Sequence, residues 1–229
     1  MDRRPRDPLM AAERTALVVR GGWEGHSPRE CTDLFLPALA DAGFAITVRE
    51  DLEAYADADL MARTDLVVQC WTEGRLTEEQ SAGLVSAVEA GTGFAGWHGG
   101  VVATFQDTPA YLRMVGGLFL HHPAEFLEYQ VRIEPEHREH PIVAGLPDTT
   151  VMTEQYWMLT DAFSTVLAST TVAPGAAGQG ERPVDMPVVW TRQWGRGRVF
   201  FSALGHRADD LREPTVRTLT TRGLLWAAR

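Results

Sequence analysis

Short apolar runs alternate with longer amphipathic stretches through the first half of the chain. The runs are bounded by glycine and polar residues, as is typical of buried strands; they are Ala16–Val19, Phe44–Val48, Asp65–Cys70 and Gly93–Trp97. Helices are expected between them, over residues 29–42 and from Thr77 to Gly91. This alternation of strand and helix predicts an α/β fold, with a mostly parallel sheet and helices on both faces.

Local signals refine both helices. Pro37 lies inside the first one, so that helix is expected to start late or to kink. Thr77 and Gln80 have the spacing of a capping box, in which each residue satisfies a free backbone N–H of the other at the start of a helix.

The second half of the chain has a different pattern. Residues 126–134 alternate between apolar and polar, which favours a half-exposed strand. Further strands are expected at 166–168, 187–190 and 198–202, with a hairpin turn at Gly195–Gly197 and a closing helix over 211–228. We interpret residues 14–229 as a single domain and residues 1–13 as a flexible N-terminal tail.

The expected strand at Gly93–Trp97 ends in the pattern Gly96-x-His98-x-Gly100. This is the spacing of a nucleophile elbow, a sharp turn from strand to helix that exposes one side chain in a strained conformation. Histidine replaces the usual serine or cysteine, which indicates acid–base chemistry or metal binding, not a covalent nucleophile. An ordinary turn that contains a histidine is the alternative.

Several other histidines follow expected strands or lie beside glycines. His26 follows the first strand, His122 follows a Gly-Gly segment, and His206 follows the strand at 198–202. Because the carboxyl ends of parallel strands share one edge of a sheet, we expect His26 and His98 to lie in one cleft. Clustered imidazoles with a carboxylate such as Glu154 would suit Zn²⁺ or a similar divalent ion, although no close His-x-x-x-His spacing is present. Each histidine could instead have a purely structural role.

Glu154 and several aromatic residues complete the candidate chemistry. Glu154 interrupts an apolar stretch next to Tyr156, where it could act as a general acid or base or simply be an exposed strand residue. Four tryptophans adjoin candidate cleft positions, and flat apolar rings suit sugars; they are Trp23, Trp71, Trp97 and Trp157. At least two of the four are expected to be ordinary core residues.

The composition limits the kinds of partner that we expect the protein to bind. The net charge is −10 and the isoelectric point is about 5.1, which argues against nucleic acid and anionic membranes as partners. No apolar segment is long enough to span a bilayer, and the first residues lack the apolar core of a signal peptide. With only two cysteines, Cys31 and Cys70, we expect a reduced, cytoplasmic protein.

The chain resembles the trehalose-utilisation (ThuA-like) family. The resemblance runs from about Thr15 to Trp226 and rests on stretches that occur in the same order: Gly25-His26, Gly93–His98, Gly116–Phe119 with His122-Pro123, His140–Ile142 with Gly145–Pro147, Thr153–Tyr156, and Pro187–Trp190 through Gly195–Val199 to Leu204–His206. It implies a flavodoxin-like three-layer sandwich, as in class I glutamine amidotransferases. It also implies that His98 replaces the amidotransferase cysteine, so that glutaminase activity is lost.

The resemblance further implies a role in carbohydrate use, on glycosides such as trehalose derivatives that have been oxidised to 3-keto forms. The roles expected are catalytic for His98, Glu154 and His206; substrate-binding for Trp23, His26, Trp71, Trp97, His122 and Tyr156; and metal-binding, to Zn²⁺ or Mn²⁺, for His26, His98, His122 and His206. Two departures from the family pattern are Gly99-Gly100 after the elbow and Gln155 in place of a second carboxylate. A non-catalytic sugar-binding or regulatory protein is the alternative, and homo-oligomer formation stays open.

Overall fold

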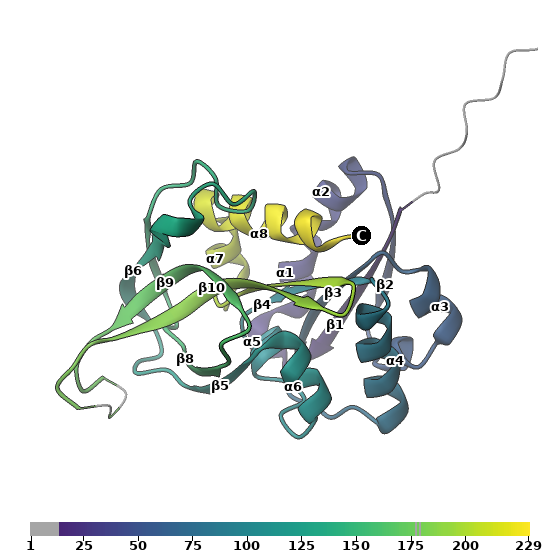
Figure 1. Ribbon diagram of the computed structural model, residues 1–229, viewed down its shortest axis with the longest axis horizontal. Helices are drawn as coiled ribbons and strands as arrows, with labels where there is room; N and C mark the ends of the chain where they lie inside the picture. Colours follow the sequence, from purple (N-terminus) through teal and green to yellow (C-terminus); the bar gives the residue numbers. More distant parts are fainter. Residues whose placement is uncertain (1–13, 177, 179) are drawn as a thin grey trace, which may run out of the picture.

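A nine-stranded mixed sheet forms the middle layer of the computed structural model, which describes residues 14–176, 178 and 180–229 (Figure 1). The predicted N-terminal tail, residues 1–13, lies outside the described residues. The sheet has a parallel half and an antiparallel half. The parallel half consists, in spatial order, of β2 (Phe44–Arg49), β1 (Arg14–Gly22), β3 (Leu66–Thr72), β4 (Gly93–Trp97) and β11 (Gly197–Ser202).

The strand order of the parallel half is the flavodoxin order, 2-1-3-4-5. The five strands are in register along one row, Val48–Val18–Val68–Ala95–Phe200. Most residues of these strands are buried, because helices cover both faces of the parallel half. The flavodoxin-like class expected from the sequence is confirmed.

The antiparallel half continues the sheet beyond β11. Its strands, in spatial order, are β10 (Val184–Trp194), β9 (Thr165–Val172), β6 (Leu127–Ile133) and β7 (Thr149–Thr153). A separate two-stranded sheet pairs β5 (Gly117–His121) with β8 (Trp157–Thr160). The hairpin between β10 and β11 turns where the sequence predicts it, whereas β5, β7 and β8 were not foreseen.

Helices form the two outer layers (Figure 1). One layer contains α1 (Pro28–Asp33), α2 (Leu36–Asp41), α7 (Ala208–Arg212) and α8 (Pro214–Ala227). The other contains α3 (Ala58–Arg63), α4 (Glu78–Glu89), α5 (Gly99–Val102) and α6 (Pro109–Val115). Short 3₁₀ turns complete the elements: η1 (Glu24–His26), η2 (Glu53–Tyr55) and η3 (Pro135–His137).

Two expected helices are each divided in two. The helix predicted over 29–42 breaks between α1 and α2, and Pro37 occupies the first turn of α2, where a missing N–H costs no hydrogen bond. The single helix predicted over 211–228 is wrong: Pro214 begins α8, and the Glu213 carboxylate caps it by accepting a hydrogen bond from the Val216 N–H. The predicted capping box of Thr77 and Gln80 is confirmed.

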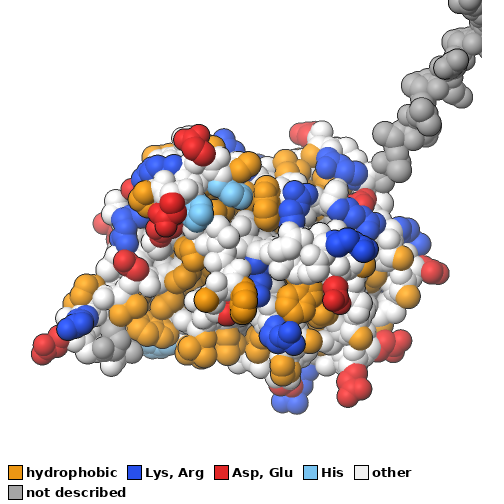
Figure 2. All heavy atoms as spheres, in the orientation of Figure 1, with side chains coloured by type: hydrophobic (Ala, Val, Ile, Leu, Met, Phe, Trp, Pro, Cys, Tyr) orange, Lys and Arg blue, Asp and Glu red, His pale blue; other side chains and the backbone are white. Residues whose placement is uncertain are grey.

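The outer surface carries charges of both signs, and Figure 2 shows them interspersed, with hydrophobic side chains gathered on the lower part of the visible face. Leu120 of β5 and Leu159 of β8 are among the exposed large hydrophobic residues. None of the helices in the described part of the chain has the length and apolar character needed to cross a membrane.

Candidate functional site

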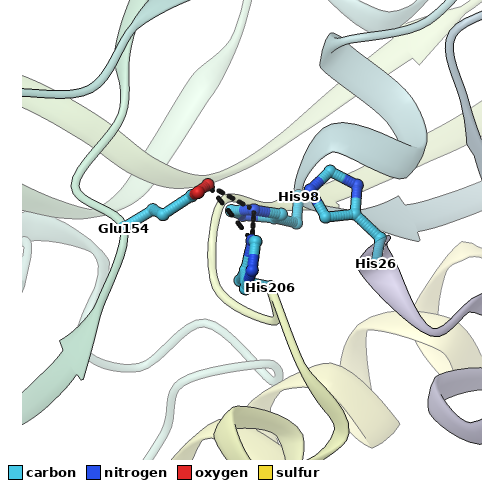
Figure 3. A group of neighbouring side chains, drawn as sticks. All are labelled: His26, His98, Glu154 and His206. Carbon is cyan, nitrogen blue, oxygen red and sulfur yellow. Dashed lines mark hydrogen bonds and ion pairs between the residues drawn. The ribbon is translucent and has the colours of Figure 1, made fainter. Parts of the chain in front are cut away.

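Three histidines lie at the carboxyl edge of the parallel half, each directly after a strand. His26 is in η1 after β1, His98 follows β4, and His206 follows β11. The chain segment between β7 and β8 brings Glu154 to the same place from the antiparallel half, and Figure 3 shows all four side chains converging. His26 and His98 therefore lie together at one edge of the sheet, as the strand order predicts, and His206 and Glu154 join them there.

The elbow at His98 has the strained geometry that the sequence predicts. Its backbone angles are φ 50° and ψ −148°, outside the regions that non-glycine residues prefer. Small neighbours are required: a Cβ on Gly99 would lie 2.3 Å from His26 Cε1, and one on Gly100 would lie 2.9 Å from the Cα of Cys70. The departure from the family pattern at Gly99-Gly100 therefore fits the close packing of this edge.

The Nε2 atom of His98 contacts three other side chains of the site. Nδ1 lies 2.8 Å from the carbonyl oxygen of Ala203, to which it donates, so Nε2 carries no proton in the neutral ring. Nε2 lies 2.7 Å from the Tyr156 hydroxyl, which donates to it, 3.0 Å from Glu154 Oε2 and 3.3 Å from His206 Nδ1. The Tyr156 ring stacks on the His98 ring at a centroid distance of 4.2 Å.

His26 and His122 border the same cluster. His26 Nδ1 is 2.7 Å from the Thr72 hydroxyl, and its ring packs edge-on against that of His98. His122 Nδ1 donates to the carbonyl of Ala124, which directs its Nε2 toward Glu154 Oε1 at 3.7 Å. The two oxygens of Glu154 therefore face different histidines.

Burial and neighbouring groups set the protonation states. Burial lowers the pKa of His98, and burial together with the nearby His98 and His206 lowers the pKa of His26 to about 3. Burial tends to raise the pKa of Glu154, but its contacts with His206 and His98 outweigh burial and hold the pKa well below its usual range. Burial raises the pKa of Tyr156 well above 10. At neutral pH, His26 and His98 are thus neutral, Glu154 is ionised and Tyr156 is protonated.

A cavity of about 500 Å³ opens beside the cluster, within the size range of small-molecule sites. Its polar lining includes His26, His122, Glu154 and Tyr156, and its aromatic lining includes Trp23, Phe105 and Phe119. Arg75 and Asp107, which form an ion pair at 3.3 Å, also line it. His98 and His206 do not line the cavity; they contact Glu154 from the protein interior.

Two of the expected aromatic contacts lie elsewhere. Trp97 is 1% exposed and packs in the core against Phe35, and Trp71 lies against Gly21 on the wall of a different cavity. The physical reason is alternation along a strand: Thr72 faces the site, so the preceding Trp71 faces away, and Trp97 does the same before His98. Of the expected tryptophans, Trp23 reaches the cavity, where it is 48% exposed.

Gln155, which replaces a second carboxylate, points away from the cavity. Its side-chain amide donates to the Thr170 hydroxyl at 2.9 Å and to the Thr171 carbonyl at 3.3 Å, both on β9. The residue is 3% exposed. Because the position faces β9 and not the cavity, the loss of a carboxylate there does not remove a group from the site.

Sequence reasoning missed several residues that build the site. Thr72 orients His26, and Tyr129 donates from β6 to the backbone carbonyl of Glu154 at 3.0 Å. Thr72 could have been found, because it is the last residue of a strand whose neighbours carry candidate histidines. Tyr129 and the ion pair of Arg75 and Asp107 carry no local signal, since their roles depend on contacts between distant segments.

The fold and the site define a flavodoxin-like α/β protein with a histidine elbow at the carboxyl edge of its sheet. The family model described as trehalose utilisation, ThuA, matches residues 15–227. The chain therefore belongs to the ThuA family.

Solved structures show the same fold at low sequence identity. A ThuA-like protein from Bacteroides uniformis is 19% identical, with a TM-score of 0.74 over 98% of this chain and 95% of that one. A ThuA-like protein from Parabacteroides merdae is 18% identical, with a TM-score of 0.76 over 94% and 90%. A cytoplasmic protein from Salmonella typhimurium is 13% identical, with a TM-score of 0.64 over 94% and 100%. Among curated proteins, no significant match was found.

Proposed function

We propose that this protein is a carbohydrate-active enzyme that uses acid–base chemistry on glycosides carrying a keto group at C3, such as oxidised trehalose. The observation that carries the proposal is the ionised Glu154 in the lining of a cavity that also has aromatic residues, next to the protonated hydroxyl of Tyr156. Aromatic faces suit sugar rings, and a base beside a proton donor suits proton transfer. The trehalose-utilisation family supports the choice of substrate.

The keto group explains why a carboxylate would be a strong enough base to remove a proton from the sugar. A carbonyl at C3 acidifies the C2–H bond, so Glu154 Oε1 can remove that proton. The electron pair then forms the C1=C2 bond while the glycosidic C1–O bond breaks, and the leaving oxygen takes a proton from Tyr156. The protonated Glu154 then returns its proton to the Tyr156 oxygen, so the net step moves one proton from C2 to the aglycone oxygen, and no oxidant or water is consumed. His98 and His206 hold the carboxylate in place, and a Zn²⁺ or Mn²⁺ ion held by these residues would supply positive charge next to the carboxylate.

The direct test is turnover of 3-keto-trehalose, with native trehalose as the comparison, in the presence and absence of Zn²⁺ or Mn²⁺. We expect release of glucose from the keto-sugar only. Glu154→Gln should reduce kcat at least about 1,000-fold, within the range for loss of a general base. Glu128→Gln, the same change at an exposed position of β6, should have no effect. Absence of turnover of any 3-keto-glycoside under all conditions would refute the proposal.

The same assay separates the alternative of a sugar-binding or regulatory protein. Binding of trehalose without any turnover, with an affinity that His98→Ala leaves unchanged, would favour that alternative. We also propose a cytoplasmic location, by analogy with the Salmonella typhimurium protein described as cytoplasmic, and no glutaminase activity, because His98 stands where amidotransferases carry cysteine.

A further inference from the structure

Three side-chain atoms of the kind that bind metal ions lie close together behind the cavity, although they come from separate parts of the chain. His98 Nε2 is 3.0 Å from Glu154 Oε2 and 3.3 Å from His206 Nδ1, and these last two atoms are 3.3 Å apart (Figure 3). All three residues are buried. The three atoms thus form a nearly equilateral triangle in the protein interior.

The size of this triangle matches a metal coordination shell. Ligands about 2.0–2.2 Å from a metal ion lie about 3.3–3.6 Å apart in a tetrahedron and about 2.8–3.1 Å apart at adjacent positions of an octahedron. The three distances observed cover the same range. Two histidines and one carboxylate also form a common ligand set of catalytic metal sites, which keep further positions open.

The position of the proton on the His98 ring also favours a cation between His98 and Glu154. The Ala203 carbonyl fixes the His98 proton on Nδ1, so Nε2 presents a lone pair to the Glu154 carboxylate, which is itself only an acceptor. A metal ion between the two atoms would be coordinated by both lone pairs.

The hydrogen bond of the second ring nitrogen of His98 is the one expected of a metal-binding histidine. Metal-binding histidines usually donate their other ring N–H to a carbonyl or carboxylate, which fixes the ring and its tautomer. His98 does this through Ala203. His26 lies next to the cluster, with its donor atom within 4.8 Å of the other three.

We propose that His98 Nε2, Glu154 Oε2 and His206 Nδ1 bind a divalent transition-metal ion, Zn²⁺ or Mn²⁺. This set differs from the four histidines expected from the sequence. Glu154 enters it. His122 leaves it, because it faces the other oxygen, Oε1, at 3.7 Å. His26 lies beside these three residues with its Nδ1 hydrogen-bonded to Thr72, and its donor atom is within 4.8 Å of theirs, which makes it a candidate fourth ligand. The site does not depend on the proposed sugar chemistry.

Metal binding has one structural consequence. The lone pair of His98 Nε2 that the ion takes is the one to which Tyr156 donates. The Tyr156 hydroxyl must then turn to another acceptor, and the cavity that it lines is the open direction. Tyr156→Phe removes this competing hydrogen bond, so it should bind metal at least as tightly as the unchanged protein.

The test is metal titration of the chelator-treated full-length protein, with Zn²⁺ and Mn²⁺ by calorimetry and with Co²⁺ by visible absorption. We expect one ion per chain, and a loss of affinity in Glu154→Gln and His206→Ala larger than the roughly 10–100-fold typical of outer-shell partners. His137→Ala and Glu128→Gln, which lie outside the cluster, serve as matched controls and should bind normally.

Thermal melting provides a second measurement that does not depend on sugar turnover. Zn²⁺ should raise the Tm of the unchanged protein and of both controls but not that of Glu154→Gln or His206→Ala, since only a bound ion stabilises the fold. Circular dichroism establishes that each variant is folded, and His206→Gln replaces His206→Ala if the latter is not. Absence of any 1:1 complex, or equal affinity in the cluster variants and the controls, would overturn the metal site even if the protein turns over keto-sugars.

Discussion

The two walls of the site are built in different ways. The histidine wall, made by His26, His98 and His206, follows strands of the parallel half, whose backbone ladder sets the position of each strand end. The glutamate wall, residues 153–156, joins β7 to β8 and contains no regular structure between Glu154 and Tyr156. Individual side-chain hydrogen bonds fix this second wall, from Tyr129 to the Glu154 carbonyl and from Gln155 to Thr170.

The two walls should therefore respond differently to the loss of a single hydrogen bond. A wall held by many backbone hydrogen bonds tolerates the loss of any one of them, whereas a wall held by two or three side chains does not. Backbone strain is nevertheless concentrated around the histidine wall. Among the described residues, the non-glycine positions with positive φ are Ser27, Glu73, His98 and Phe105. Glu73 and Phe105 line the cavity, and Ser27 directly follows His26. Such strain persists only where the surrounding structure is rigid.

The largest effect is expected where the glutamate wall is anchored to β9. In Gln155→Glu, a carboxylate replaces the amide that donates to the Thr171 carbonyl, and the position is 3% exposed. A buried, unpaired charge and a lost donor should reduce the free energy of unfolding by about 2–4 kcal/mol. Urea denaturation at pH 7 measures this loss.

The pH dependence gives the control for Gln155→Glu. Burial raises the pKa of the introduced carboxyl, so the destabilisation should shrink as the pH falls below about 5 and the neutral acid regains a donor. Gln155→Met, which adds no charge, should cost less than Gln155→Glu at pH 7. Equal stability of the Glu variant and the unchanged protein would mean that this wall is not anchored through Gln155.

A smaller effect is expected from the loss of one hydrogen bond in each wall. Tyr129→Phe removes the donor to the Glu154 carbonyl, and Tyr55→Phe removes the donor to Gln69, whose amide donates to the Gly100 carbonyl below the His98 elbow. Each should cost about 1–2 kcal/mol in the free energy of unfolding, as is usual for a buried hydrogen bond. Only Tyr129→Phe should also lower kcat, by about tenfold, because Glu154 loses its position. A similar loss of kcat in both variants would contradict the difference between the walls.

The same difference explains what the sequence can predict. The parallel strands and the elbow at His98 follow from local patterns, because apolar runs and glycine spacing report directly on buried strands and tight turns. The meeting of His26 with His98 then follows from the rule that parallel strand ends share an edge. The placement of His122, Glu154 and His206 rested on the family resemblance. No local pattern brings the loop that carries Glu154 to that edge, and the hairpin signal at Gly195–Gly197 does not show that β11 runs parallel to β4.

Two other expectations were wrong for different reasons. The helix over 211–228 was expected to be continuous because its apolar spacing continues through Glu213, although Pro214 gives a local signal for a new start. The tryptophans Trp71 and Trp97 were expected in the cleft because they adjoin it in sequence. Their actual direction depends on the phase of alternation in β3 and β4, which the strand ends alone do not give.

The smallest effect is expected at the opposite end of the parallel strands, far from the site. The Asp65 carboxylate accepts a hydrogen bond from the Thr15 N–H at 2.8 Å and pairs with Arg229. Partial burial tends to raise the pKa of Asp65, but the hydrogen bonds from Arg229 and Thr15 lower it below the ordinary value of 3.8. A lowered pKa in the folded state means that the carboxylate stabilises the fold above about pH 4 and that this stabilisation is lost as the pH falls through the lowered value.

Asp65→Asn should therefore reduce the free energy of unfolding by less than about 1 kcal/mol at pH 7, as is usual for an ion pair that solvent reaches. The difference from the unchanged protein should fade toward pH 3 in urea denaturation. Because the contacts that hold the histidine wall lie at the other end of the strands, kcat for the keto-sugar and the affinity for Zn²⁺ should both stay within twofold. A larger change in either would mean that single contacts at the far end of the strands do position the histidines, and the contrast between the two walls would fail.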